Sequence, residues 1–302
     1  MTHYQLVAQN KYKALGVILG FVFFVVGSAY LMARGLGYGL DVVGFALIFS
    51  GLTSFFGFYY SDKIILGLSG AREAKRTEFF DFYTVTENVC HSQKIPLPKL
   101  YVIDDTAMNA FATGRDPDHS VVCATTGLLT RLNRTEIEGV VAHELSHIKN
   151  YDIRLMSLVT VLIGMIALLS DWMLRMTWWG GGRRRDSREG GQLQLILFVV
   201  GLTLALLSPL IAQLIKLAIS RKREFLADAS GVAITKNPQG LISALTKLEL
   251  DHEPLEAANK ATAHLYITNP LKYAKGGAHW FASLFATHPP IAERLAALRK
   301  IA

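Results

Sequence analysis

Two histidines separated by one turn of helix are the residues of this sequence best suited to chemistry. They belong to the segment His143-Glu144-Leu145-Ser146-His147. Because positions i and i+4 share one face of a helix, the two imidazoles can bind a single tetrahedral Zn²⁺. Glu144 projects close to the same face, where it can hold a water at the metal. Chance would produce this pattern in on the order of one chain in a hundred, so we interpret it as part of a zinc site.

A third protein ligand must come from elsewhere in the chain, because a catalytic zinc takes three protein ligands and keeps a fourth position open. The remaining histidines are candidates, and so are several acidic residues. The acidic candidates are Glu189, Glu224, Asp228, Glu249, Glu253, Glu256 and Glu293. The choice among them depends on the elements that must position the site.

Four apolar stretches without any charged residue dominate the rest of the sequence. They are Ala14–Ala33, Val42–Ser61, Leu155–Ser170 and Leu193–Ile215. A hydrocarbon core of about 30 Å needs roughly 20 apolar residues of helix, and none of these stretches has the polar face of a core helix. Three of them reach this length, and the 16-residue Leu155–Ser170 reaches it if Trp172, Met173 and Leu174 extend it. Only 18% of the whole chain is charged, against about 25% in soluble domains. We therefore predict four transmembrane helices, which excludes an ordinary soluble enzyme, and we expect no removable signal peptide.

The basic residues near the ends of these stretches predict the topology. Basic residues are about twice as numerous on the side that holds both termini and segment 62–154 as on the opposite side. The side with more basic residues is expected to face the cytoplasm. Membrane topology and anionic lipid explain the net charge of +7 better than nucleic-acid binding does. Cys90 and Cys123 do not form a disulfide framework, which also indicates a reducing compartment.

Depth relative to the membrane selects the third ligand. His147 precedes Leu155 by a stretch of helix about 12 Å long, and Glu224 follows Ile215 by about 13.5 Å. Two neighbouring helices that leave the same membrane face would therefore bring His147 and Glu224 to similar depth. Asp228 lies one turn after Glu224 and is the candidate partner for the second N–H of a ligand histidine.

The other acidic candidates are placed less well by this argument. Glu189 would lie across the membrane, and Glu249 and later residues are separated from the fourth stretch by Pro238. The resulting site would be cytosolic and close to the lipid headgroups.

The polar segments predict a small mixed domain around the zinc helix. Thr135 and Glu138 have the spacing of a capping box at the start of that helix. The expected elements are a helix over 77–94, strands over 100–103, 109–112 and 121–123, a loop-rich stretch over 254–287, and a last helix from Pro289-Pro290 to about Lys300.

With His, His and Glu as ligands, the expected reaction is metal-assisted hydrolysis, in which Glu144 acts as general base. His288 precedes a helix start, so it is a candidate oxyanion donor or a resting-state ligand of the open zinc position; it is equally consistent with no catalytic part. Asn109-Ala110-Phe111-Ala112 is either an edge strand that pairs with an extended substrate or an ordinary core strand.

These motifs together resemble the HtpX family of bacterial membrane zinc proteases. The resemblance rests on the apolar stretches and the zinc helix, and also on the segments Glu224-Phe225-Leu226-Ala227-Asp228, Asn109–Arg115 and Thr287–Leu295. It implies a gluzincin-type metallopeptidase fold related to the CAAX-prenyl endopeptidases. It also implies one Zn²⁺ per subunit on His143, His147 and Glu224, with Glu144 catalytic, and a stress-linked role in clearing damaged or misassembled membrane proteins from the bacterial inner membrane.

The sequence thus predicts a mainly α-helical multi-pass membrane protein that carries a cytosolic metallopeptidase domain with a small β-sheet. Its expected parts are a pair of transmembrane helices (1–61), a catalytic segment with the zinc helix (62–154), a second pair (155–215) and a C-terminal segment with the third ligand (216–302). Membrane proteins and the lipid bilayer are the expected partners, without nucleic acid or an organic cofactor. One alternative is a prenyl-type processing protease. The other is a membrane scaffold without turnover, and the intact Glu144 disfavours this second alternative.

Overall fold

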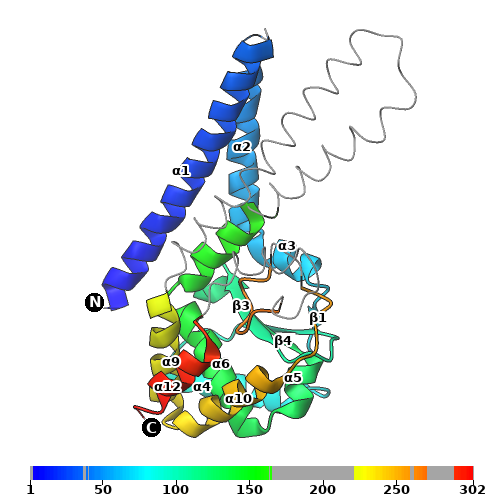
Figure 1. The fold of residues 1–302 in the computed structure, drawn as a ribbon, viewed down its shortest axis with the longest axis vertical. Coiled ribbons are helices and arrows are strands. Elements are labelled where there is room, and N and C mark those ends of the chain that lie inside the picture. Colours follow the sequence, from blue (N-terminus) through cyan, green and yellow to red (C-terminus); the bar gives the residue numbers. More distant parts are fainter. Residues whose placement is uncertain are drawn as a thin grey trace, which may run out of the picture.

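Two long apolar helices project from the rest of the protein along its long axis (Figure 1). The computed structural model describes residues 3–36, 39, 41–162, 164, 221–258, 262–270 and 289–301. Helices α1 (His3–Leu36) and α2 (Asp41–Tyr59) run side by side. Within α1, Ala8–Gly27 is long and apolar enough to cross a membrane. Helix α2 meets that criterion together with α3 (Ser61–Leu68), although the two are bent by 79° at their junction.

The first two predicted spans therefore fall on α1 and α2. The described residues hold one helix that can cross a membrane, or two if the bent pair counts as one span. Of the third predicted span, only the helical residues 155–162 and 164 are described, and they continue a helix that begins at residue 152. The fourth span lies outside the described residues. Four transmembrane helices thus remain a prediction.

A small mixed sheet lies in the part of the molecule below α1 and α2 (Figure 1). Its order is β1-β2-β4-β3, with β2 and β4 parallel and the other two pairs antiparallel. The strands are β1 (Arg72–Glu73), β2 (Lys99–Ile103), β3 (Ala110–Gly114) and β4 (Ser120–Thr125). The three predicted strands are present with bounds shifted by up to two residues, whereas the short β1 was not predicted. A 3-10 turn, Pro117–His119, connects β3 to β4.

Helices cover both faces of this sheet, so every residue of β3 and β4 is buried. Alternate residues such as Leu100 and Val102 pack into one apolar cluster with α4 (Phe80–Gln93), α6 (Arg134–Lys149), α10 (Pro238–Leu250) and α12 (Ile291–Leu298). Ile103 and Phe111 point the other way, into a second cluster with α3 and the helix that begins at residue 152. The period of two residues is that of a sheet buried on both sides.

Helix α6 is the centre of the first cluster, and 12 of its 16 residues are buried. Its capping box is formed by Asn133 and Glu136, each accepting a hydrogen bond from the backbone N–H of the other. The predicted capping pair, Thr135 and Glu138, is therefore wrong by two residues. Both pairs have the same three-residue spacing, but only Asn133 is the extended residue that precedes the helix. The short helix α5 (Thr126–Arg131) precedes this turn.

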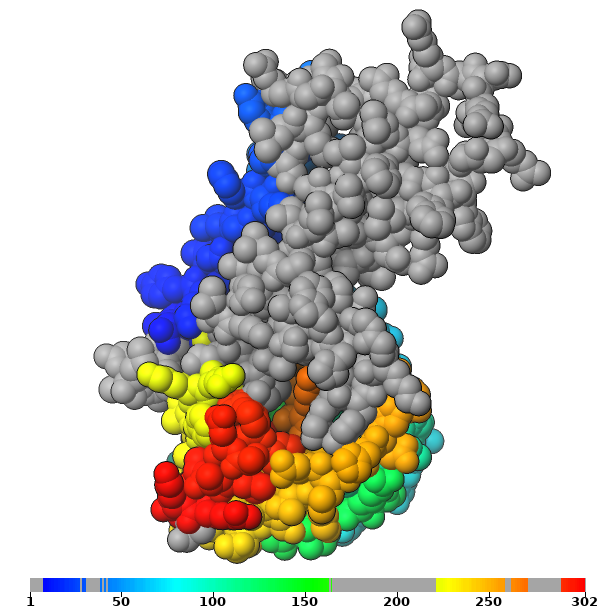
Figure 2. Space-filling model, viewed as in Figure 1, coloured from blue at the N-terminus to red at the C-terminus, as the bar shows by residue number. Residues whose placement is uncertain are grey.

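The C-terminal elements complete the fold. Helix α12 contacts both α9 (Arg221–Thr235) and α10, and the three lie on one face of the part of the molecule that holds the sheet (Figure 2). The predicted bounds of the last helix, 289–300, and of the helix over 77–94 extend beyond α12 and α4 by a few residues. Residues 254–258 and 262–270 hold no helix or strand, in agreement with the loop-rich prediction as far as the structure describes that stretch.

Candidate metal centre

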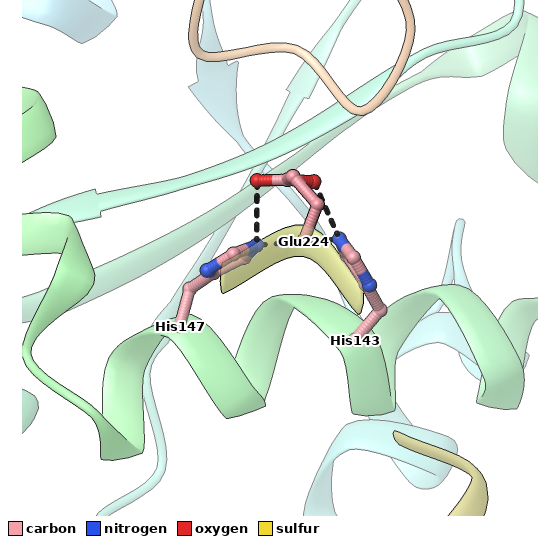
Figure 3. Close-up of side chains that lie close together, drawn as sticks. All are labelled: His143, His147 and Glu224. Carbon is pink, nitrogen blue, oxygen red and sulfur yellow. Dashed lines mark hydrogen bonds and ion pairs between the residues drawn. The ribbon is translucent and has the colours of Figure 1, made fainter. Parts of the chain in front are cut away.

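Two elements from distant parts of the chain bring three potential metal ligands together. Helix α6 presents His143 and His147 on one face, and α9 crosses beside it and directs Glu224 at both imidazoles (Figure 3). All three side chains are buried. Gly231 permits this close crossing, because a Cβ at that position would lie only 3.3 Å from the main-chain N of His143.

The spacing of the three side chains fits a tetrahedral zinc ion. The Nε2 atoms of His143 and His147 are 3.3 Å apart; Nε2 of His143 lies 3.7 Å from Oε2 of Glu224, and Nε2 of His147 lies 3.7 Å from Oε1. Ligand atoms placed about 2.0–2.1 Å from a tetrahedral ion are roughly 3.3–3.4 Å apart. Two imidazoles and one carboxylate are also a ligand set typical of catalytic zinc. The three residues therefore form a group that can hold one metal ion.

A carboxylate supports the far side of His143. The Oδ1 atom of Asp228, one turn after Glu224 on α9, lies 2.9 Å from Nδ1 of His143. Arg294 of α12 donates two hydrogen bonds to the same carboxylate, at 2.9 and 2.6 Å, and a third to the carbonyl of Ile267 at 3.1 Å. A fully buried guanidinium thus ties the C-terminal helix to the back of the metal site.

A second carboxylate supports His147 in the same way. Asp152 follows the end of α6, and its Oδ2 lies 3.1 Å from Nδ1 of His147. Its other oxygen accepts a hydrogen bond of 3.3 Å from Arg223 of α9. Each histidine therefore has a carboxylate on its second nitrogen, which fixes the ring so that the first nitrogen points toward the metal position.

The charges of these groups shift their pKa values strongly. Burial opposes the charged form of His147, but the hydrogen bond to Asp152 and the charge of Glu224 outweigh it and raise its pKa to about 9. Burial also raises the pKa of Asp228, yet Arg294 outweighs it and lowers that pKa to about 2. Burial lowers the pKa of Arg294, and Asp228 in turn raises it. Asp228 and Arg294 therefore form a permanently charged pair at neutral pH.

The structure places most of the predicted site residues. Glu144 is buried on α6, and its charge acts on both His147 and Arg294. Asp228 contacts His143 rather than the metal position. His288 and Glu189 lie outside the described residues. The remaining acidic candidates are at least partly exposed and do not join the group; they are Glu249, Glu253, Glu256 and Glu293.

Two important side chains were not predicted. Asp152 reaches back to His147 because Tyr151 has a left-handed backbone (φ 59°), which periodicity does not reveal. Arg294 had a recognisable signal, since it lies on the same helical face as Ile291, Leu295 and Leu298. A single charge within an apolar stripe indicates a buried partner.

Comparison with known proteins identifies the family. The sequence model of peptidase family M48 matches residues 78–302 of this chain. The chain belongs to peptidase family M48. A protease HtpX homologue of Streptococcus uberis is 41% identical over 301 residues, which cover 98% of this chain and 99% of the relative. The corresponding protein of Thermoanaerobacter pseudethanolicus is 42% identical over 302 residues and covers 99% and 98%.

A solved structure shows the same fold at lower identity. The crystal structure of S. mikatae Ste24p aligns with a TM-score of 0.51 and 20% identity, covering 98% of this chain and 67% of Ste24p. The family resemblance inferred from the motifs is therefore confirmed, and the chain is an HtpX-type membrane metalloprotease. Peptidases of family M48 depend on zinc, and the group on α6 and α9 can bind a metal.

Proposed function

We propose that this chain is a zinc-dependent endopeptidase that hydrolyses damaged or misassembled membrane proteins at the cytosolic face of the bacterial inner membrane. The observation that carries the proposal is the buried group of His143, His147 and Glu224, with Glu144 beside it. In this proposal the first three bind one Zn²⁺ and Glu144 is catalytic. No organic cofactor and no nucleic acid takes part.

The chemistry divides between the metal and Glu144. Bound zinc supplies a Lewis acid that polarises a peptide carbonyl and activates water near neutral pH. Glu144 would accept a proton from the attacking water as the C–O bond forms at the carbonyl carbon, and would then pass that proton to the amine nitrogen as the C–N bond breaks. Asp228 and Asp152 keep the two imidazoles oriented.

Strand β3 offers a place for an extended substrate, because it is one of the two edge strands of the sheet. Alternate residues of an antiparallel strand turn their main-chain groups away from the partner strand. At one end of this edge the carbonyl of Ala110 accepts a hydrogen bond from the N–H of Ile267, and at the other the N–H of Gly114 donates to the Ser157 hydroxyl. Ala112 lies between them, and we place the substrate backbone there.

The proposed membrane topology is the one that the sequence predicts. Residues 1–61 and 155–215 supply two pairs of transmembrane helices, and 62–154 together with 216–302 form the cytosolic catalytic part. The apolar helix α1 and the distribution of basic residues support this topology. A cysteine introduced at the exposed Ser92 should react with a membrane-impermeant thiol reagent in inside-out vesicles and not in right-side-out ones. The opposite labelling pattern would refute the cytosolic orientation.

The catalytic proposal is tested with full-length protein in detergent and an unfolded membrane protein as substrate. Glu144→Gln should keep zinc but lose cleavage, because an amide cannot accept the proton of the water. Glu138→Gln is the matched control, since it makes the same change on the same helix at a partly exposed position. Cleavage by Glu144→Gln at the wild-type rate would show that the assigned mechanism is wrong.

A further inference from the structure

The turn that follows α6 carries one of the carboxylates of the metal centre. Helix α6 ends at Lys149 with Asn150 as its C-cap, Tyr151 takes the left-handed conformation with φ 59°, and Asp152 begins the next helix. A residue with a side chain adopts this conformation only where its surroundings hold it. The position of Asp152, and with it the orientation of His147, therefore depends on what packs against the turn.

The membrane helix α1 supplies the contacts that hold this turn. The Asn10 side-chain amide donates one hydrogen bond to the carbonyl of Asn150 at 2.9 Å and another to Oδ1 of Asp152 at 2.8 Å. The next residue, Lys11, places its ammonium 5.3 Å from the ring centre of Tyr151. All three residues of the turn are thus contacted from one point of α1, across about 140 residues of sequence.

The side chain of Asn10 is far less exposed than the apolar side chains on the outer face of the same helix. It is 2% exposed, whereas Leu15, Leu19 and Phe23 on the same helix are more than half exposed. A buried amide is costly unless its hydrogen bonds are satisfied. Here the two donors of the amide are both used, and both are directed at the turn rather than at neighbouring apolar side chains.

We propose that Asn10 is a positioning residue of the metal centre, which acts on His147 through Asp152. The membrane anchor is then a structural part of the active site rather than only a tether. The inference rests on the proposed zinc site. Two donors share Oδ1 of Asp152, Asn10 from α1 and Arg223 from α9, which leaves Oδ2 for the imidazole of His147.

The experiment measures how fast full-length protein in detergent loses Zn²⁺ to an excess of chelator. Removing a group that directly supports a ligand costs about 10–100-fold in metal affinity. Asn10 acts one step further away, so Asn10→Ala should lose zinc about 3–10-fold faster than wild type. Asn10→Asp has the same shape but turns a carboxylate toward Asp152, so it should lose zinc faster still.

Gln9→Glu is the matched control, because it makes the same amide-to-acid change at an exposed position of the same helix. It should release zinc within about twofold of wild type. Thermal unfolding in chelator shows whether each variant folds. Wild-type zinc release by a folded Asn10→Asp variant overturns the inference, since a purely structural role would tolerate the isosteric change.

A double substitution tests the route of the effect. In an Asp152→Ala background, adding Asn10→Ala should accelerate zinc loss no further, because the intermediary is already gone. The same fold-change in both backgrounds would contradict the proposed route.

His147→Ala separates this inference from the proposed function. If His147→Ala retains zinc, the proposed metal site is wrong. If it loses zinc while the Asn10 variants behave as wild type, only the role of Asn10 is wrong.

Discussion

The two halves of this molecule place side chains in opposite ways. Helices α1 and α2 turn large apolar groups outward, with Phe23 81% and Phe45 73% exposed. Around the metal centre, charged groups are buried, and Glu224 and Arg294 have no exposed surface. The outward apolar groups require only a nonpolar solvent such as lipid, whereas each buried charge requires a partner at a fixed distance. The exposed apolar positions of α1 and α2 should therefore tolerate substitution far better than the buried charges of the metal centre.

The largest contrast is expected at Glu224. Glu224→Ala removes a carboxylate ligand and leaves two imidazoles, so zinc content of the purified protein and cleavage should fall together. The loss of affinity should exceed the roughly 100-fold limit typical of a lost supporting hydrogen bond. Metal analysis after gel filtration measures it. Full zinc occupancy in this variant would remove Glu224 from the site.

The next effect is expected at Arg294, whose charge pairs with Asp228 in the interior. Arg294→Met leaves that carboxylate buried without its cation, which costs about 3–5 kcal/mol for a broken buried pair. Chemical unfolding in chelator measures the loss separately from zinc binding. Arg294→Lys should recover only part of it, because a lysine cannot form the two parallel bonds of a guanidinium. Wild-type stability of Arg294→Met would show that the pair contributes nothing.

A smaller effect is expected where α9 crosses α6. Gly231→Ala adds a methyl group 3.3 Å from a main-chain atom of His143, so α9 must shift by a few tenths of an ångström and carry Glu224 with it. Overpacking of this kind costs about 1–3 kcal/mol, and zinc release should accelerate with it. Gly67→Ala is the control, since a Cβ there meets nothing within 4 Å. Equal zinc release by the two variants would refute the tight crossing.

The smallest effect is expected on the membrane half. Phe45→Ala in α2 should change the unfolding free energy in detergent by less than about 1 kcal/mol, because the ring packs against few protein atoms. The same change at Phe111, which is fully buried and packs edge-to-face against Tyr266, should cost about 3–5 kcal/mol. Similar losses at the two positions would abolish the distinction between the halves.

The sequence predicted the parts of the site that depend on helical spacing. His143 and His147 are recognisable because one turn of α6 separates them, and Asp228 follows Glu224 by the same interval. The predictions failed where a single backbone conformation decides the outcome. Asp152 is brought to His147 by the left-handed Tyr151, and nothing in the pattern of apolar residues indicates that turn.

The predicted mainly helical fold with a small sheet is confirmed, and its errors are local ones. Two overlapping pairs of residues satisfied the capping pattern before α6, and only the observed geometry distinguishes Asn133 from Thr135. Strand β1 has two residues, too few to show a period. By contrast, β2, β3 and β4 have enough buried residues to be recognised from their composition.

The bond between Arg294 and Asp228 also has a consequence in time. The two residues are 66 positions apart, and α12 is the later of the two helices to be synthesised. At about 5–20 residues per second, the ribosome needs roughly 3–13 s to extend the chain from one to the other. During that interval both histidines and Glu224 already exist without the guanidinium that anchors Asp228. A nascent chain on the ribosome therefore holds an incomplete metal centre, and its completion waits for the C-terminal helix.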